Sequence, residues 1–298
     1  GVQNSEGAEK MPYTALKPSQ ELVDIVGSLG GVWHGYVATC RCPAHVDRTP
    51  SLSLRQGDRG ILVTCFAGCE AEDVLREIRR IPVTRRFEPP KADIRRGTGN
   101  VERLWEQARD VMQTLGERYL QRRHIVAGPA DLRFHPRCPL GPKGRTVFKP
   151  ALLVGVREGH RLVAFQRIFL DPATADYECK VMLGQPGQGA WQGRPLQGDT
   201  LAIAEGSETA AALTILHGVP CWATLGARRF DHLGLPSALA NLLLAQDNDP
   251  EGEAAAVRAE AHYARPRLNI RRAPPPGRIK DWAIVLDREQ ERGGGSSG

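Results

Sequence analysis

The stretches LAIAEGSETA (residues 201–210) and NLLLAQDNDPEG (residues 241–252) share one pattern. Each begins with a short apolar run, continues with acidic residues and leads into helix-forming residues. Apolar strands that alternate with helices predict a parallel sheet covered on both faces. Because the carboxyl ends of such strands border the ligand crevice, we expect Glu205, Asp247 and Asp249 to converge there.

Carboxylates gathered at one edge of a sheet repel one another, so their clustering needs a compensating charge. Hard oxygen ligands favour Mg²⁺ or Mn²⁺, and the sequence therefore predicts a divalent cation site at Glu205, Asp247 and Asp249. A second interpretation stays open for the DND segment. An Asp before a helix is a common N-cap, and Asp249 is placed to cap a helix over residues 251–264.

A second group of residues has the spacing of metal ligands. Cys42 and His45 are separated by two residues, Cys65 and Cys69 by three, and strand-like sequence lies between the pairs. Thiolates and an imidazole in this spacing predict a closed tetrahedral zinc site with a structural role.

Cys40 is an alternative to Cys42, but residues i and i+2 of a strand lie about 6–7 Å apart, so one ion does not readily bind both. We prefer Cys42, because the two-residue gap to His45 allows a tight turn. Buried free thiols are the remaining alternative.

Composition limits the class of protein. With 298 residues and 41% hydrophobic content, the chain can form two or three domains, and seven cysteines argue against a disulfide framework. No long apolar run or secretory signal is evident, so we expect a cytoplasmic protein. Residues 100–198 carry 15 Lys+Arg against 9 Asp+Glu, which favours an acidic partner such as nucleic acid over a merely solvated basic surface.

Helical periodicity and strand patterns predict the remaining elements. The apolar positions between residues 101 and 120 indicate one long helix or a pair, with Gly116 as a possible break. Two strand-like runs flank Glu158-Gly159-His160 and predict a hairpin. Helices are also expected at 20–29, after an N-cap at Ser19, and at 71–80.

The cysteine-containing region resembles a known family. CPAHVDRTPSLSL (42–54) followed by TCFAGC (64–69) is similar to the CHC2-type zinc ribbon of bacterial and phage primases, most closely in a plasmid and phage branch. Three residues rather than two separate the last cysteines, unlike the chromosomal form. In that family the ribbon holds single-stranded template. The resemblance implies that the following side chains face the strand: Arg48, Arg55, Arg59 and Phe66.

The acidic motifs resemble a second family. EGSETA and DNDPEG, in this order, are similar to the Toprim fold of DnaG-type primases, topoisomerases and some nucleases, over about residues 199–287. GRIKDW (277–282) resembles the late metal-site turn of that family. The resemblance implies that Asp281 is a further ligand and that Lys280 contacts phosphate.

Two positions depart from the Toprim pattern. The residue four after the Glu, often Asp in primases, is Thr209, and Ala283 replaces the second acid of the late turn. Glu208 lies one residue earlier, and its side chain should point some 100° away from that of position 209 on a helix. We therefore do not count Glu208 as a ligand.

The basic middle region resembles the primase core, whose strands present cations to nucleic acid. VAFQRIFLD (163–171) is the most similar segment. The resemblance implies contacts to nucleic acid or nucleotide from Arg167 and Lys180, with Arg161 and the Lys143/Arg145 loop as further candidates.

The predicted fold class combines α+β and α/β parts: a small β-rich zinc ribbon, a basic α+β subdomain and a Toprim-like parallel-sheet domain. The predicted boundaries are 11–86 for the zinc-binding domain, 87–99 for a linker, 100–198 for the basic primase-core subdomain, 199–290 for the Toprim domain and 291–298 for a tail.

The resemblance implies a DNA primase that joins nucleotides on single-stranded DNA. It would use structural Zn²⁺ and catalytic Mg²⁺ or Mn²⁺, with Glu205, Asp247, Asp249 and Asp281 as the catalytic carboxylates. The implied partners are the template strand, NTPs or dNTPs and a separate replicative helicase, with no membrane. Two alternatives stay open: a Toprim nuclease or topoisomerase-like enzyme, and a non-catalytic protein that binds single-stranded DNA.

Overall fold

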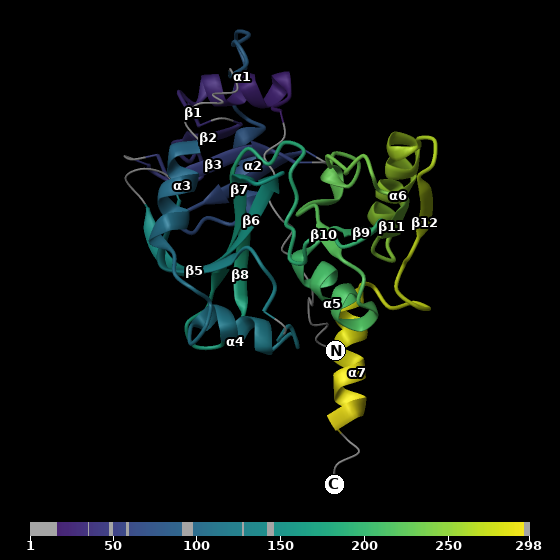
Figure 1. Ribbon diagram of the computed structural model, residues 1–298. Helices are drawn as coiled ribbons and strands as arrows, with labels where there is room; N and C mark the ends of the chain where they lie inside the picture. Colours follow the sequence, from purple (N-terminus) through teal and green to yellow (C-terminus); the bar gives the residue numbers. More distant parts are fainter. Residues whose placement is uncertain are drawn as a thin grey trace, which may run out of the picture. The chain divides into compact units, whose positions relative to one another are not determined.

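The chain forms two compact units (Figure 1). We call them the Cys/His unit, residues 14–97 with 138–149, and the two-sheet unit, residues 98–137 with 150–298. A computed structural model describes residues 17–34, 36–47, 50–57, 60–90, 98–126, 128–141 and 146–294. Four of the predicted nucleic-acid contacts lie outside the described residues: Arg48, Arg59, Lys143 and Arg145.

The Cys/His unit is a four-stranded antiparallel sheet with two helices packed on it. The strands run in the order β1 (Val32–His34), β2 (Val37–Cys40), β3 (Leu52–Gln56) and β4 (Ile61–Cys65). Helix α1 (Gln20–Ser28) begins after Ser19, whose side chain accepts a hydrogen bond from the Leu22 amide, and α2 (Ala71–Ile78) follows the last cysteine. Among the described residues, ten buried side chains form the core cluster of this unit, and a core of this size provides limited stability.

An antiparallel sheet lies mostly in the two-sheet unit, and the end of its first strand and the start of its second extend into residues 138–149. Its strands are ordered β5 (Leu132–Leu140), β6 (Val147–Glu158), β7 (Arg161–Leu170) and β8 (Tyr177–Gly184). The hairpin predicted around Gly159 joins β6 to β7 and is confirmed.

The helical region before this sheet is a pair, α3 (Thr98–Gln107) and α4 (Leu115–Gln121). The predicted break at Gly116 is wrong. The Thr114 hydroxyl caps α4 by accepting from the amides of Gly116 and Glu117, so Gly116 lies inside the first helical turn and the break precedes it.

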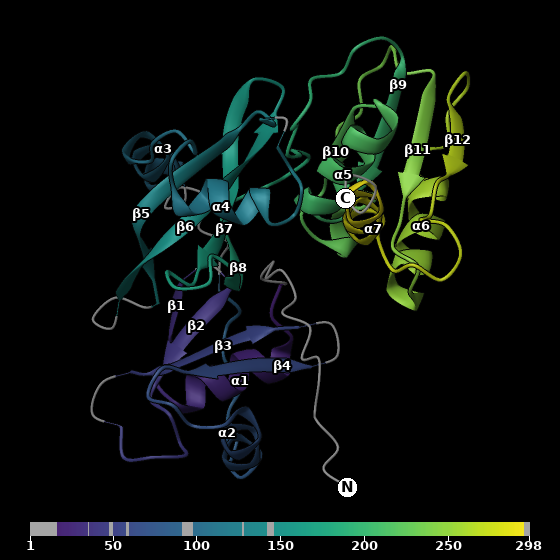
Figure 2. The same cartoon turned by 90° about the horizontal axis from the view of Figure 1, so that it is seen from below.

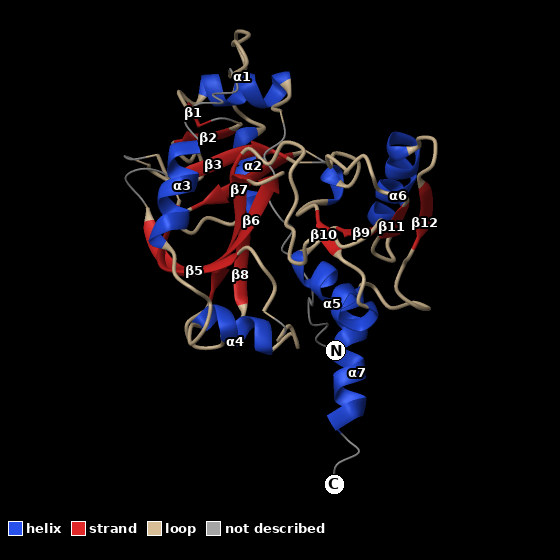
Figure 3. Cartoon of the chain, in the orientation of Figure 1, coloured by secondary structure: helices blue, strands red, loops and turns tan. Residues whose placement is uncertain are grey.

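A parallel sheet forms the second half, as predicted. Its order is β10 (Cys221–Ala223), β9 (Thr200–Ala204), β11 (Asn241–Ala245) and β12 (Asn269–Arg272), and all neighbours are parallel. Figure 3 shows the helices that accompany these strands: α5 (Ser207–His217), η1 (Ala227–Arg229), α6 (Pro250–Tyr263) and α7 (Trp282–Gly294). Helix α7 is not predicted from the sequence and continues into the segment expected to be a tail.

Both faces of the parallel sheet are covered. Side chains of a strand alternate between faces, so Leu201 and Ile203 pack in one core cluster with residues of α6. Ala202 and Ala204 point the other way and pack in a second cluster with residues of α5. Helices α5 and α7 also contact each other, as seen in Figure 2. The fold class predicted from the sequence is confirmed.

The two sheets of the second unit share one core. Residues of β6, β7 and β9 belong to the same buried cluster. The segment between the sheets adds backbone bonds to both: Ala190 pairs with Arg157 of β6, and Trp191 pairs with Ala223 of β10. Positions of side chains across the two sheets are therefore coupled. No helix in the described part of the chain is long and apolar enough to span a bilayer.

Candidate active site and metal centre

The four predicted catalytic carboxylates line one cleft of about 280 Å³ in the two-sheet unit. Glu205 directly follows β9, and Asp247 comes two residues after β11 ends. These strands are parallel neighbours in which Ala204 lies opposite Ala245, so their acidic ends reach the same edge of the sheet. Asp249 precedes α6 and Asp281 precedes α7. The structure thus brings all four carboxylates together.

Asp247 lies where the electrostatic conflict is greatest. Burial, followed by the negative charges of Glu205, Asp281, Asp249 and Glu251, raises the pKa of Asp247 to about 8. Its Oδ1 atom is buried and has no hydrogen-bond partner among the described residues. A buried oxygen without a donor is costly, and a hard divalent cation satisfies it. Asp247 and its acidic neighbours therefore fit Mg²⁺ or Mn²⁺.

Asp249 and Asp281 also act as helix caps. The Asp249 Oδ1 atom accepts from the Gly252 amide at 2.7 Å, and the Asp281 Oδ1 atom accepts from the Ile284 amide at 3.0 Å. The capping interpretation of Asp249 is therefore confirmed. Each cap occupies one oxygen of a carboxylate that has two, so capping and cation binding are compatible.

The acidic side chains are near one another without being tightly gathered. In the described residues, no three of these carboxylates have oxygens that all lie within 4.8 Å of one another. Like charges repel one another at short range, which opposes closer packing of these carboxylates.

Gly252 is required by the close turn from β11 into α6. A Cβ atom at this position would lie 2.3 Å from the Asp247 carbonyl oxygen, a contact that real side chains do not make. The glycine of DNDPEG thus lets the helix start directly against the backbone that carries Asp247.

Cations occupy the opposite wall of the cleft. Lys180 from β8 and Arg123, just after α4, line it, whereas Lys280 lies beside Asp281 in the late turn and also lines the cleft. Lys180 lies opposite Ile168 in the β7–β8 pairing, so Gln166 and Lys180 share one face of the sheet. Buried Gln166 lines the same cleft, although no pattern in the sequence indicates this role.

Arg167 and Arg161 lie elsewhere on the sheet. Arg167 is adjacent to Gln166 and therefore points to the other face of β7, where its guanidinium lies 5.5 Å from the Phe169 ring centroid. Arg161 is exposed at the hairpin and forms an ion pair with Glu158 at 3.0 Å. The structure therefore does not bring these two arginines to the carboxylates.

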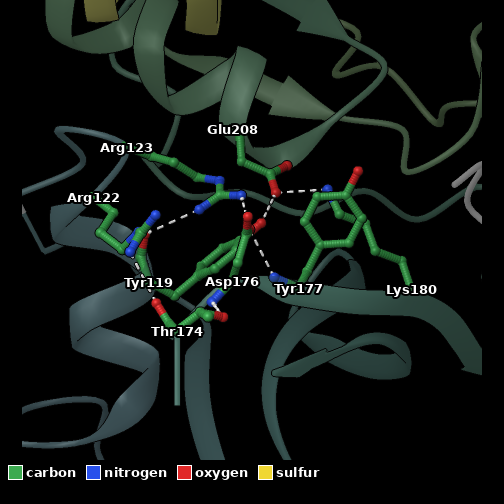
Figure 4. A network of polar contacts seen from close by, with 8 residues as sticks. All are labelled: Tyr119, Arg122, Arg123, Thr174, Asp176, Tyr177, Lys180 and Glu208. Atoms are coloured by element: carbon green, nitrogen blue, oxygen red, sulfur yellow. Dashed lines mark hydrogen bonds and ion pairs between the residues drawn. The ribbon is translucent and has the colours of Figure 1, made fainter. Parts of the chain in front are cut away.

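Glu208, which we did not count as a ligand, lies in the cleft wall. Its Oε1 atom accepts from the Lys180 ammonium at 2.6 Å and from the Tyr119 hydroxyl, as Figure 4 shows. Burial alone would raise the pKa of Glu208, but Lys180 and the hydrogen bonds lower it to about 2. Glu208 is visible in the sequence within the SET triplet, but the residues that bond to it, Lys180 and Tyr119, come from distant segments.

The two departures from the Toprim pattern both line the cleft. Thr209 is buried there and Ala283 faces it from the start of α7. Neither supplies a carboxylate, so the cation site has fewer acidic groups than the pattern provides.

The Cys/His unit contains the second candidate metal site. Among the described residues, Cys42, His45, Cys65 and Cys69 form the group whose ligand atoms all lie within 4.8 Å of one another. The His45 Nδ1 atom is 3.2 Å from the Cys69 sulfur, so Nδ1 is the ring nitrogen that faces the thiols. Cys40 is buried in β2 and is not a member of this group.

Asp47 fixes the loop that carries two of these ligands and was not identified from the sequence. Its carboxylate, only 1% exposed, accepts from the Cys42 amide at 2.8 Å and from the Ser51 amide at 3.0 Å. It also lies 3.8 Å from the Nε2 atom of His45, on the side opposite the ligand nitrogen. Such outer carboxylates orient metal-bound histidines.

The thiols of this group differ in acidity. Burial raises the pKa of Cys42 to about 12. Burial also acts on Cys65, but backbone amides of Cys69 and Ala67 outweigh it and lower the pKa of that thiol. Because zinc binds thiolates, its binding releases protons and should strengthen as pH rises.

We expect Cys65→Ser to lose zinc and to unfold residues up to about 80, while the two-sheet unit stays folded. Asp47→Asn should keep all four ligands but weaken zinc affinity by about 10- to 100-fold. Metal analysis and amide hydrogen exchange measure both effects. Glu77→Gln is the matched control, because Glu77 pairs with Arg80 at 2.8 Å on α2 and should leave the affinity unchanged. Full zinc retention in Cys65→Ser would contradict the ligand assignment.

Asp247→Asn should change how stability depends on pH. The folded pKa of Asp247, about 8, lies above its ordinary 3.8, so its contribution to stability is present in acid and is lost as pH rises to about 8. The variant cannot ionise there. In buffer without divalent cations, its melting temperature minus that of the parent should therefore increase between about pH 4 and pH 8.

Thermal melts of the two-sheet unit measure this difference. Asp199→Asn, an exposed acid outside the cleft lining, serves as the control and should show a constant difference. Chelators must be omitted, because they would remove zinc from the Cys/His unit. A pH-independent difference for Asp247→Asn would show that the carboxylates are not in conflict.

Comparison with solved structures identifies primases as similar folds. The catalytic core of DnaG is 17% identical, with a TM-score of 0.46 over 64% of this chain and 74% of that one. A DNA primase domain from Pseudomonas aeruginosa is 16% identical, with a TM-score of 0.45 over 65% and 76%. The zinc-binding and RNA polymerase domains of the Aquifex aeolicus primase are 14% identical, with a TM-score of 0.42 over 94% and 84%.

Comparison with sequence families divides the two-sheet unit into two parts. No curated protein matches the chain. Residues 95–193 match a domain of unknown function, DUF7146. Residues 200–294 match the Toprim domain, which includes all of α7. The C-terminal part of this chain is therefore a Toprim domain, as the order of EGSETA and DNDPEG indicates.

Proposed function

We propose that this chain is a DNA primase that makes short primers on single-stranded DNA by cation-dependent nucleotidyl transfer. One observation carries the proposal: the cleft is acidic although the chain is basic. Six carboxylates line it, Glu205, Glu208, Asp247, Asp249, Glu251 and Asp281, against three cations, Arg123, Lys180 and Lys280. Such a lining repels phosphates unless divalent cations reverse its sign.

In the proposed reaction, a 3′ hydroxyl attacks the α-phosphate of a nucleotide and pyrophosphate leaves. Divalent cations held by the carboxylates would stabilise the charge on the attacked phosphate and on the leaving group. Glu205, Asp247, Asp249 and Asp281 are the proposed ligands, and Glu205 is also the candidate base for the hydroxyl proton. The caps at Asp249 and Asp281 support the proposal, because they fix both side chains before substrate arrives.

Lys180 and Lys280 are the proposed contacts to the nucleotide phosphates, because both line the cleft that contains the carboxylates. Either NTPs or dNTPs fit this chemistry. Arg161, Arg167 and Arg145 are the proposed contacts to the template strand. Arg161 and Arg167, which the structure describes, are not part of the cleft lining.

The Cys/His unit has a separate proposed role. We infer that it binds one structural Zn²⁺ and holds the template through Arg55 and Phe66, whose ring is exposed. A separate replicative helicase is a proposed partner.

Two alternatives use the same cleft. Hydrolysis of a phosphodiester needs the same carboxylates, so a Toprim nuclease is the first alternative. A topoisomerase-like reaction needs a tyrosine nucleophile, and Tyr119 is a poor one because it is buried and bonded to Glu208. Thr209 and Ala283 favour the second alternative, a protein that binds single-stranded DNA without catalysis. Incubation with single-stranded DNA, nucleotides and Mg²⁺ or Mn²⁺ separates these outcomes as primers, cleavage or neither.

Asp247→Asn should abolish most primer synthesis while the protein stays folded. Loss of one cation should lower the rate by at least ~10²-fold, since a metal contributes several kcal/mol at the developing charge. Primer formation on single-stranded DNA measures the effect, and DNA binding should change little. Synthesis at the parental rate would leave Asp247 with no catalytic role.

Binding of single-stranded DNA should weaken steeply as salt increases, because arginine and lysine side chains that bind the phosphates displace the counterions of the DNA. Lys180→Ala and Arg167→Ala, made separately, show which face of the antiparallel sheet contacts the strand. Each lost phosphate contact should reduce the slope of log affinity against log salt by about 0.7. An unchanged slope in both variants would place the DNA on another surface.

A further inference from the structure

We propose that Glu208 is a positioning residue that holds the Lys180 ammonium at the wall of the cleft, and that it is not a cation ligand. This inference rests on the proposed function, because it assigns Lys180 to the phosphates of the nucleotide. The observation behind it is the buried polar network drawn in Figure 4.

Both oxygens of Glu208 are already engaged. Oε1 accepts from the Lys180 ammonium at 2.6 Å and from the Tyr119 hydroxyl. Oε2 accepts from the Ser207 hydroxyl at 3.1 Å. A carboxylate with these three donors has little capacity left for a cation, unlike Asp247, whose buried Oδ1 has no partner among the described residues.

The ion pair is shielded from water. The side chains of Lys180 and Glu208 are only 16% and 12% exposed. An ammonium in such a place needs a countercharge, and the carboxylate supplies it. The ammonium has three protons to donate, so one bond to Glu208 leaves others for a phosphate in the cleft that Lys180 lines.

Neighbouring groups hold the network from the other sides. The Lys180 ammonium lies 5.0 Å from the ring centroid of Tyr177. Arg123 stacks on the Tyr119 ring, with 3.8 Å to its centroid, and forms an ion pair with Asp176 at 2.7 Å. Lys180 and Arg123 therefore each have a carboxylate partner. These contacts restrict the orientation of the Lys180 side chain.

The pair also crosses from one part of the unit to the other. Glu208 is in the first turn of α5 in the Toprim domain, whereas Lys180 and Tyr119 belong to β8 and α4. Glu208 therefore sets where a lysine of the antiparallel sheet stands relative to the carboxylates of the parallel sheet.

The test uses Glu208→Gln, Lys180→Met and the double variant in the full-length, zinc-loaded protein. Glu260→Gln is the matched control. Glu260 lies on α6, pairs with Arg272 at 2.7 Å and is not part of the cleft lining. Lys180 reactivity is read by amine acetylation and mass spectrometry, with exposed Lys17 as the internal reference. Affinities are measured for Mn²⁺ alone and for ATP with Mg²⁺.

We expect Glu208→Gln to increase acetylation of Lys180 several-fold and to leave that of Lys17 unchanged. ATP affinity should fall roughly tenfold, the effect of losing one charge-assisted contact, and Mn²⁺ affinity should stay near the parental value. In the double variant, ATP affinity should equal that of Lys180→Met, because Glu208 acts only through Lys180. Glu260→Gln should change none of these quantities.

An unchanged acetylation rate at Lys180 in Glu208→Gln overturns the positioning role. So does a loss of Mn²⁺ affinity as large as that in Asp247→Asn, which would make Glu208 a ligand. Neither measurement requires enzymatic activity, so failure of primer synthesis in the parent counts against the proposed function alone. If Glu208→Gln does not fold, the double variant decides, because it leaves no unpaired charge: ATP affinity well below that of Lys180→Met would contradict the inference.

Discussion

The in-register pairing of β9 with β11 is the constraint on which the rest of the cleft depends. It places Glu205 and Asp247 at the same edge of the sheet, where burial and like charge oppose the ionisation of Asp247. A fold organised only for stability would avoid this arrangement, since each buried carboxylate without a partner costs free energy. Cations at this edge, as the proposed function requires, would resolve the conflict, so the feature that weakens the free protein would also prepare the site.

The second constraint is the core that the two sheets share. Because β7 and β9 contribute to one buried cluster, the antiparallel sheet forms the other wall of the cleft at a fixed position. Strand alternation then selects which side chains enter: Gln166 and Lys180 do, and Arg167 does not. Glu208 joins the two walls through a buried ion pair, and this pair needs both sheets to be in place.

Much of this organisation was predictable from the sequence, and the exceptions have physical causes. Apolar runs bounded by acids identified the parallel strands, and ligand spacing favoured Cys42 over Cys40. The position of Glu208 in the cleft wall was not predicted. Side chains of consecutive helix residues differ in direction by about 100°, but this difference matters less where the first turn of the helix points toward the cleft. Whether Gln166 faces the cleft depends on the register of β7 with β8, which a single sequence does not specify.

The basic side chains of the surface and the charged side chains of the cleft differ in their balance, which the overall net charge does not reveal. Residues 100–198 carry a net positive charge, yet two cations that this region contributes to the cleft, Lys180 and Arg123, are each neutralised by a carboxylate. The cleft therefore has no excess cation with which to attract a polyphosphate. In the proposed function, nucleic acid is attracted by basic side chains elsewhere on the surface, whereas a phosphate enters the cleft together with divalent cations at the acidic edge. Binding and catalysis can then be altered independently, because they use different charges.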